Sequence, residues 1–69
     1  MSLINRIQQA FKLRPNVVAV VLNHTRHREL CEAHAGVCDG IYGVPLVAAN
    51  VRRDYVVYEN YDGPMIEFL

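Results

Sequence analysis

The feature that most constrains the fold is an unbroken, valine-rich run between two asparagines, Asn16 to Asn23, with the sequence NVVAVVLN. β-Branched side chains favour strands, where they pack well on a pleated surface. The run is apolar at odd and even positions alike, a pattern typical of a strand covered on both faces. The sequence therefore predicts a buried central strand.

A first helix is predicted before this strand. Apolar residues recur at helical spacing from Leu3 to Phe11, and Ser2 is a suitable N-cap. Pro15 disfavours helical geometry at the residue before it, which ends the helix near Leu13. A helix this short needs a surface to pack on. That surface is either the domain's own sheet or another subunit.

A second helix is predicted after the strand, from about Arg26 to Ala35, with Asn23 or Thr25 as its cap. Its first turn contains Arg26 and Arg28, although the helix dipole favours acidic residues there. Residues that depart from a local structural preference often belong to functional sites, so these arginines are candidates for a functional role.

The stretch from Gly40 to Glu59 predicts two strands, Ile41–Ala49 and Tyr55–Tyr58, joined by a polar, basic bend. Pro45 cannot donate to a sheet ladder, so the first of these strands lies at an edge or bends there. A turn at Asp62 to Pro64 precedes an apolar end of the chain that we expect to form a short strand on the sheet or on a neighbour.

These elements predict one small α+β domain covering residues 1–69. The expected order is helix, strand, helix, strand, strand, with a short and mainly antiparallel sheet of three or four strands and the helices on one face. A chain of 69 residues buries a modest core. Oligomerisation, a metal ion or a disulfide often stabilises domains of this size.

The charges sum to zero but are segregated along the chain. Residues 1–28 carry five basic and no acidic side chains, whereas residues 29–69 carry two basic and seven acidic ones. Folding can bring the two halves together and cancel them. The same asymmetry also suits an acidic partner for the basic end, or contacts between copies of the chain.

The sequence also indicates the cellular compartment through the features that it lacks. The sequence has no apolar run of about 18 residues and no secretory signal, so neither a membrane span nor export is expected. Its two cysteines do not make a disulfide framework. We expect a cytoplasmic protein, in the host cell or in a virion if the chain is of phage origin.

His27, Cys31, His34 and Cys38 form the one candidate metal set. Their spacings of four, three and four residues would place them on one side of a continuous helix, and zinc binds four such ligands. The other interpretation is that Cys31 and His34 face the core. Cys31 and His34 also have the spacing of a nucleophile and base. No oxyanion feature or orienting acid accompanies them, so we expect no enzyme and no cofactor, with a zinc-stabilised domain as the alternative.

A nucleic-acid surface is a further alternative. Basic residues near aromatic ones suit single strands, and such a patch would combine Arg26, Arg28, Arg52 and Arg53 with Tyr42, Tyr55 and Tyr58. The seven acidic side chains and the pI near 6.8 count against it. Nucleic acid is therefore not the expected partner, although the zinc alternative includes it.

The middle of the chain resembles part of the major capsid proteins of tailed phages with the HK97-type fold. The matching pieces, within residues 17–62, are a buried strand ending in Asn, a helix, a segment with the pattern aromatic-Gly-x-Pro-apolar-apolar at Tyr42–Val47, and an aliphatic strand at Asp54–Tyr58. Those capsid proteins are several times longer and carry a long spine helix and an N-terminal arm. The resemblance therefore implies a module of a phage or prophage particle, with an assembly role and no catalysis.

These observations together predict a non-enzymatic protein-interaction or assembly module that forms homo-oligomers, most simply a dimer. It would be a particle component or a binder and inhibitor of a host protein. Exposed aromatic and arginine side chains are favoured at protein interfaces. The residues expected to contact a partner are Ile7, Phe11, Arg52, Arg53, Tyr55, Phe68 and Leu69.

Overall fold

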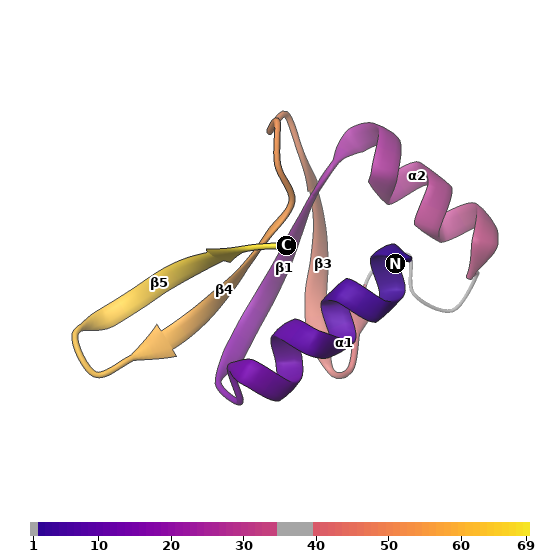
Figure 1. Cartoon of the computed structure of the whole chain (residues 1–69). Helices are drawn as coiled ribbons and strands as arrows, with labels where there is room; N and C mark the ends of the chain where they lie inside the picture. Colours follow the sequence, from indigo (N-terminus) through magenta and orange to yellow (C-terminus); the bar gives the residue numbers. More distant parts are fainter. Residues whose placement is uncertain (1, 35–39) are drawn as a thin grey trace.

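The computed structural model describes residues 2–34 and 40–69 and contains two helices and a five-stranded sheet (Figure 1). The elements in chain order are α1 (Leu3–Leu13), β1 (Val17–Asn23), α2 (His24–Ala33), β2 (Gly40–Ile41), β3 (Val44–Ala49), β4 (Tyr55–Asn60) and β5 (Gly63–Phe68). The predicted α+β class is confirmed. The predicted strand at the end of the chain is β5, and it pairs along its whole length with β4.

The sheet order is β2-β3-β1-β4-β5, which places the valine-rich strand in the centre as the sequence predicted. β1 runs parallel to β3 and antiparallel to β4, and the other neighbours are antiparallel. Three of the four neighbouring pairs are antiparallel, so the sheet is mainly antiparallel as expected, but it has five strands instead of three or four and a different strand order. The chain passes through α2 between β1 and β3, and such a crossover returns the next long strand in the same direction.

The single strand predicted at Ile41–Ala49 is divided into β2 and β3 by a tight turn. Tyr42 and Gly43 both have positive φ, 52° and 81°, as a two-residue hairpin turn of type I′ requires. Pro45 lies opposite Gly40, and the ladder with β1 begins only at Leu46. The proline thus avoids the parallel ladder, where a missing N–H would leave a gap.

Local capping sets the helix boundaries. The Ser2 side chain accepts a hydrogen bond from the Asn5 amide at 3.3 Å, as expected for an N-cap of α1. α2 begins at His24, two residues earlier than predicted, because the Asn23 side chain accepts a bond from the Thr25 amide at 2.9 Å. The central strand therefore passes directly into α2 without a loop.

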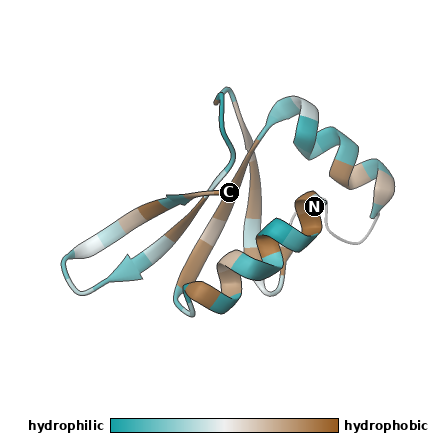
Figure 2. Cartoon of the chain, viewed as in Figure 1, coloured by the Kyte–Doolittle hydropathy of each residue, from teal (hydrophilic) through white to brown (hydrophobic). Residues whose placement is uncertain are grey.

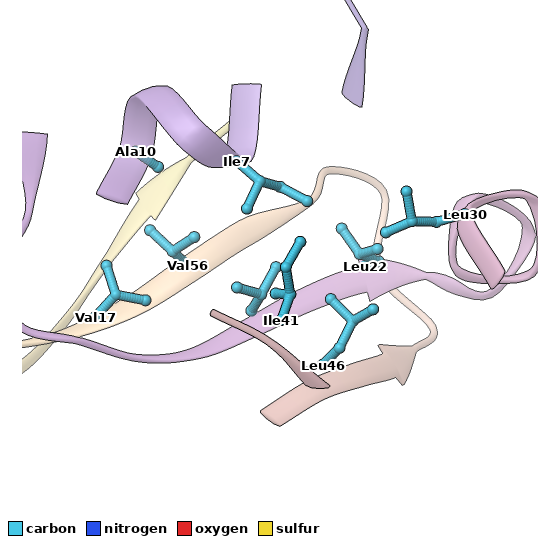
Figure 3. Close-up of a cluster of buried hydrophobic side chains, with 9 residues drawn as sticks. Ile7, Ala10, Val17, Leu22, Leu30, Ile41, Leu46 and Val56 are labelled. Carbon is cyan, nitrogen blue, oxygen red and sulfur yellow. The ribbon is translucent and has the colours of Figure 1, made fainter. Parts of the chain in front are cut away.

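The core lies between the sheet and both helices (Figure 3). Ile7 and Ala10 of α1 and Leu30 of α2 are buried in one cluster with side chains from four strands: Val17, Val20, Leu22, Ile41, Leu46 and Val56. α1 therefore packs on its own sheet, which decides between the two surfaces that the sequence left open. In Figure 2 most of the sheet is apolar, whereas α2 and the outer side of α1 are largely polar.

Ile7 anchors α1 to this core and is fully buried. We expect Ile7→Ala to lower the free energy of unfolding by about 3 kcal/mol, because it removes apolar contacts and leaves a cavity. Ile7→Val should have an effect of about 1 kcal/mol. Urea unfolding measures both, with exposed Gln9→Ala on the same helix as the control. An Ile7→Ala variant as stable as Gln9→Ala would contradict this account of the core.

Candidate interaction surface

The face of the sheet opposite the helices is almost entirely apolar. Successive side chains of a strand point to opposite faces, and Val20, Leu46 and Val56 are aligned on the helix-covered face. The alternate positions on the other side form what we call the open face: Ala19, Val21, Val47, Ala49, Tyr55, Val57, Glu59, Pro64, Ile66 and Phe68.

The helices leave this face exposed to solvent. The buried residues of the two helices, Ile7, Ala10 and Leu30, all pack against the other side of the sheet. Val47, Ile66 and Phe68 are 42%, 49% and 50% exposed. Each of them nevertheless lies beside an apolar or aromatic residue of the adjacent strand. Contiguous exposed apolar patches rimmed by polar residues are characteristic of protein-binding surfaces.

A shallow groove crosses the open face at the end where β3 and β4 are joined. Its lining combines the aromatic pair of β4 and β5 with the arginines of the bend: Val51, Arg52, Arg53, Tyr55, Ile66 and Phe68. The Tyr55 and Phe68 rings meet edge to face, with their centroids 6.3 Å apart. The Arg53 guanidinium carbon lies 4.4 Å from the centroid of the Phe68 ring, within cation–π distance.

Asp54 holds the bend that presents these arginines. Its side chain is 7% exposed, accepts a hydrogen bond from the Asn23 amide at 2.8 Å, and forms an ion pair with the side chain of Arg26. Its backbone oxygen also accepts from the amide of Leu69 at 3.0 Å. One buried carboxylate residue thus joins the start of α2, the bend and the end of the chain.

The unusual arginine in the first turn of α2 has a structural partner. Besides pairing with Asp54, Arg26 donates from its Nη2 to the backbone oxygen of Arg52 at 3.1 Å. The side-chain amide of Asn23 donates to the oxygen of Val51 at 2.7 Å. The mismatch with the helix dipole is therefore offset by a contact between elements that are far apart in sequence.

The structure brings together four of the seven residues predicted to contact a partner. Arg52, Arg53, Tyr55 and Phe68 line the groove just described. The other three lie on the helix-covered side or within the core. Ile7 is 0% exposed, so its side chain has no surface to offer a partner. Phe11 and Leu69 are half-buried and pack against the core cluster.

Phe11 has a clear role within the fold. Its ring meets the Tyr42 ring edge to face with centroids 5.1 Å apart, and Gln8 donates from Nε2 to the Tyr42 hydroxyl at 2.8 Å. These contacts hold the β2–β3 turn against α1. Tyr42 is therefore on the helix side of the sheet, away from Arg53, and the basic and aromatic residues considered for nucleic acid do not form one patch.

The candidate zinc ligands are described only in part. Cys38 lies outside the described residues. His27 and Cys31 are one turn apart on α2, and the Cys31 Sγ is 3.7 Å from Nδ1 of His27. His34 is the exposed C-cap of α2. Within residues 2–34 and 40–69, no group of three or more His, Cys, Asp or Glu side chains is placed to hold a metal ion.

Sequence reasoning missed the aliphatic part of the open face, namely Val47, Val57 and Ile66. A signal for them exists, because each stands two residues from another member of the face along its strand. However, the strands are apolar at most positions, so the sequence alone did not show which set faces the helices.

Comparison with protein-family models, with curated proteins and with solved structures finds no match. Neither helix of the described chain is long and apolar enough to cross a membrane.

Asp54 should contribute measurably to stability. We expect Asp54→Ala to lower the free energy of unfolding by about 2 kcal/mol, because it leaves the Asn23 amide without its acceptor and Arg26 without its ion pair. The exposure of Arg26 keeps the effect below that of a fully buried pair. Urea unfolding provides the measurement, and exposed Glu32→Ala on α2 is the control. Equal stability of the two variants would show that the bend does not depend on this carboxylate.

Proposed function

We propose that the chain is a non-enzymatic protein-interaction module that binds through the open face. The observation that carries this proposal is the exposure of Val47, Ile66 and Phe68 on a sheet face whose other members are also apolar, apart from Glu59. Leaving such a surface in water is unfavourable by about 25 cal/mol for each Å² of apolar area. A partner that covers the face recovers that free energy.

The composition of the groove supports binding to protein. Arginine and tyrosine are enriched among the residues that contribute most to protein interfaces, and Arg53, Tyr55 and Phe68 stand together there. The ring contacts between Tyr55 and Phe68 order these side chains before any partner arrives, which reduces the entropy lost on binding. We therefore assign the groove at this end of the sheet to the recognition of a protein.

A phage origin belongs to the same proposal. Its support is the resemblance of residues 17–62 to part of the HK97-type capsid proteins, above all the segment from Tyr42 to Val47. A particle component and a binder of a host protein both need a surface such as the open face. The two roles differ only in which protein covers it.

The zinc-stabilised alternative also has one favourable observation. Ligand distances of about 2.3 Å for sulfur and about 2.0 Å for nitrogen place the two donor atoms about 3.5 Å apart in a tetrahedral site. The distance of 3.7 Å between Cys31 Sγ and His27 Nδ1 is close to that value. Two ligands on one helix still need two further donors, and those would have to come from residues such as His34 and Cys38.

A chelator distinguishes the two functions. We expect the purified protein to bind no stoichiometric zinc in native mass spectrometry and to keep its melting temperature within about 1 °C in excess EDTA, because the apolar core alone stabilises the fold. The Cys31→Ser variant, treated in the same way, is the control for metal bound through α2. One zinc ion per chain with a large fall in melting temperature on chelation would instead establish the alternative.

Photo-cross-linking tests the proposed function in the cells that natively produce the protein. A photoreactive phenylalanine analogue at Ile66 should form adducts with protein, because that position lies on the open face. The matched control is the neighbouring Met65, which is 44% exposed against 49% for Ile66 but points to the other face. Adducts at position 66 and not at 65 are the expected result. Equal yields at the two positions, or none at either, would overturn the proposal.

A further inference from the structure

We propose that the open face is covered by a second copy of this chain, in a face-to-face dimer with antiparallel strands. This inference rests on the proposed function and names its partner. It follows from how charge is distributed at the two ends of an otherwise apolar surface. These charges lie at the two ends of the β4–β5 hairpin, which projects beyond both helices in Figure 1.

The two ends of the hairpin carry opposite charges. Arg52 and Arg53 are exposed at the bend where β4 begins, and the Arg53 guanidinium lies over Phe68 on the open face. Glu59 is exposed on the open face near the far end of β4, and Asp62 is exposed in the turn beyond it. Glu59 is six positions after Arg53, a distance of about 20 Å along an extended strand.

This arrangement is complementary to itself under one two-fold axis. Consider a two-fold axis that lies between the two open faces and runs perpendicular to the strands, at the level of Val56. Because Val56 is midway between positions 53 and 59, this axis places Arg53 of each copy opposite Glu59 of the other. An axis along the strands would instead bring the arginines of both copies to the same end. Like charges facing each other oppose association, so the antiparallel arrangement is favoured.

The dimensions allow the ion pairs to form. Packed sheets lie about 10 Å apart with their strands within about 30° of each other. A long arginine and a glutamate extending towards each other can span that separation at the rim. Between the two rims, Val57, Ile66 and Phe68 of each copy would interdigitate with the same residues of the other, as in the core of a β-sandwich.

The area of the open face is sufficient only for a weak, transient dimer. Four strands about 4.8 Å apart and about 20 Å long present a face of about 15 by 20 Å. About 300 Å² per copy corresponds to the apolar patches found on monomers, which are frequently functional, and is below the roughly 800 Å² per partner of a standard stable interface. The self-complementary face also suits an isologous contact, the commonest kind in homodimers.

The free edge of β5 is a poorer surface for a second copy. The Glu59 amide donates to the oxygen of Asn16 at 3.0 Å, so it points away from β5. In an antiparallel ladder, its partner residue Pro64 then turns its nitrogen towards the outer edge, where proline has no hydrogen to donate. An edge with a missing donor in a strand this short disfavours pairing between copies.

Charge reversal tests the dimer and its register together. We expect the wild-type chain to sediment as a dimer at about 100 µM, and Arg53→Glu and Glu59→Arg each to raise the dissociation constant at least about tenfold by placing like charges together. The double variant R53E/E59R should return to within about threefold of the wild type, because both pairs are again opposite in sign. An equimolar mixture of the two single variants should form heterodimers, which native mass spectrometry resolves by mass.

A matched pair of reversals controls for net charge. Arg28→Glu and Glu32→Arg change the charge by the same amounts at exposed positions of α2, on the other side of the sheet. They should neither weaken the dimer nor favour heterodimers when mixed. If they behave as the Arg53 and Glu59 variants do, long-range attraction explains the result and the proposed register is overturned.

The remaining outcomes separate this inference from the proposed function. A wild-type chain that stays monomeric at about 100 µM, or a dimer that neither reversal weakens, would overturn the antiparallel dimer. If cross-linking at position 66 then captures a different protein, the open face is still a binding surface and only its occupant is wrong. If position 66 captures nothing, both proposals fail.

Discussion

The structure depends on the central strand β1, which forms a ladder on both edges but is covered by helices on only one face. Val20 and Leu22 on the covered face are fully buried beneath α1 and α2. Ala19 and Val21 lie on the other face, where no helix packs; Val21 is 8% exposed between its neighbours Val47 and Tyr55. Strands that are apolar on both faces are typically buried on both faces. The uncovered face is therefore the physical origin of the proposed interaction.

The bend at Asp54 connects the stability of the fold to the geometry of the surface. The carboxylate is buried, yet it bonds to the backbone at the end of β1 and to Arg26 at the start of α2. These bonds fix the position at which Arg52 and Arg53 leave the sheet. Because Arg53 then lies over Phe68, the rim of the open face is ordered by the same contacts that join the elements of the fold.

Size explains why an interaction would also benefit the chain itself. A domain of 69 residues buries a smaller fraction of its surface than a larger one, and its stability is correspondingly modest. Covering the open face adds buried apolar area without lengthening the chain. Association also stabilises the folded state by mass action, since a partner that binds only the folded form shifts the folding equilibrium.

The amino-acid sequence by itself determined the elements close to strong local signals. The valine run predicted β1, Ser2 and Pro15 bounded α1, and the final apolar residues predicted a strand, because β-branching, capping and proline geometry act over a few residues. Tertiary structure decided the rest. The parallel pairing of β3 with β1, the turn at Tyr42 that divides the predicted strand, and the partner of Arg26 all depend on residues distant in sequence. So does the open face: strands that are apolar at nearly every position do not reveal which side the helices cover, and only their packing leaves Val47, Ile66 and Phe68 exposed.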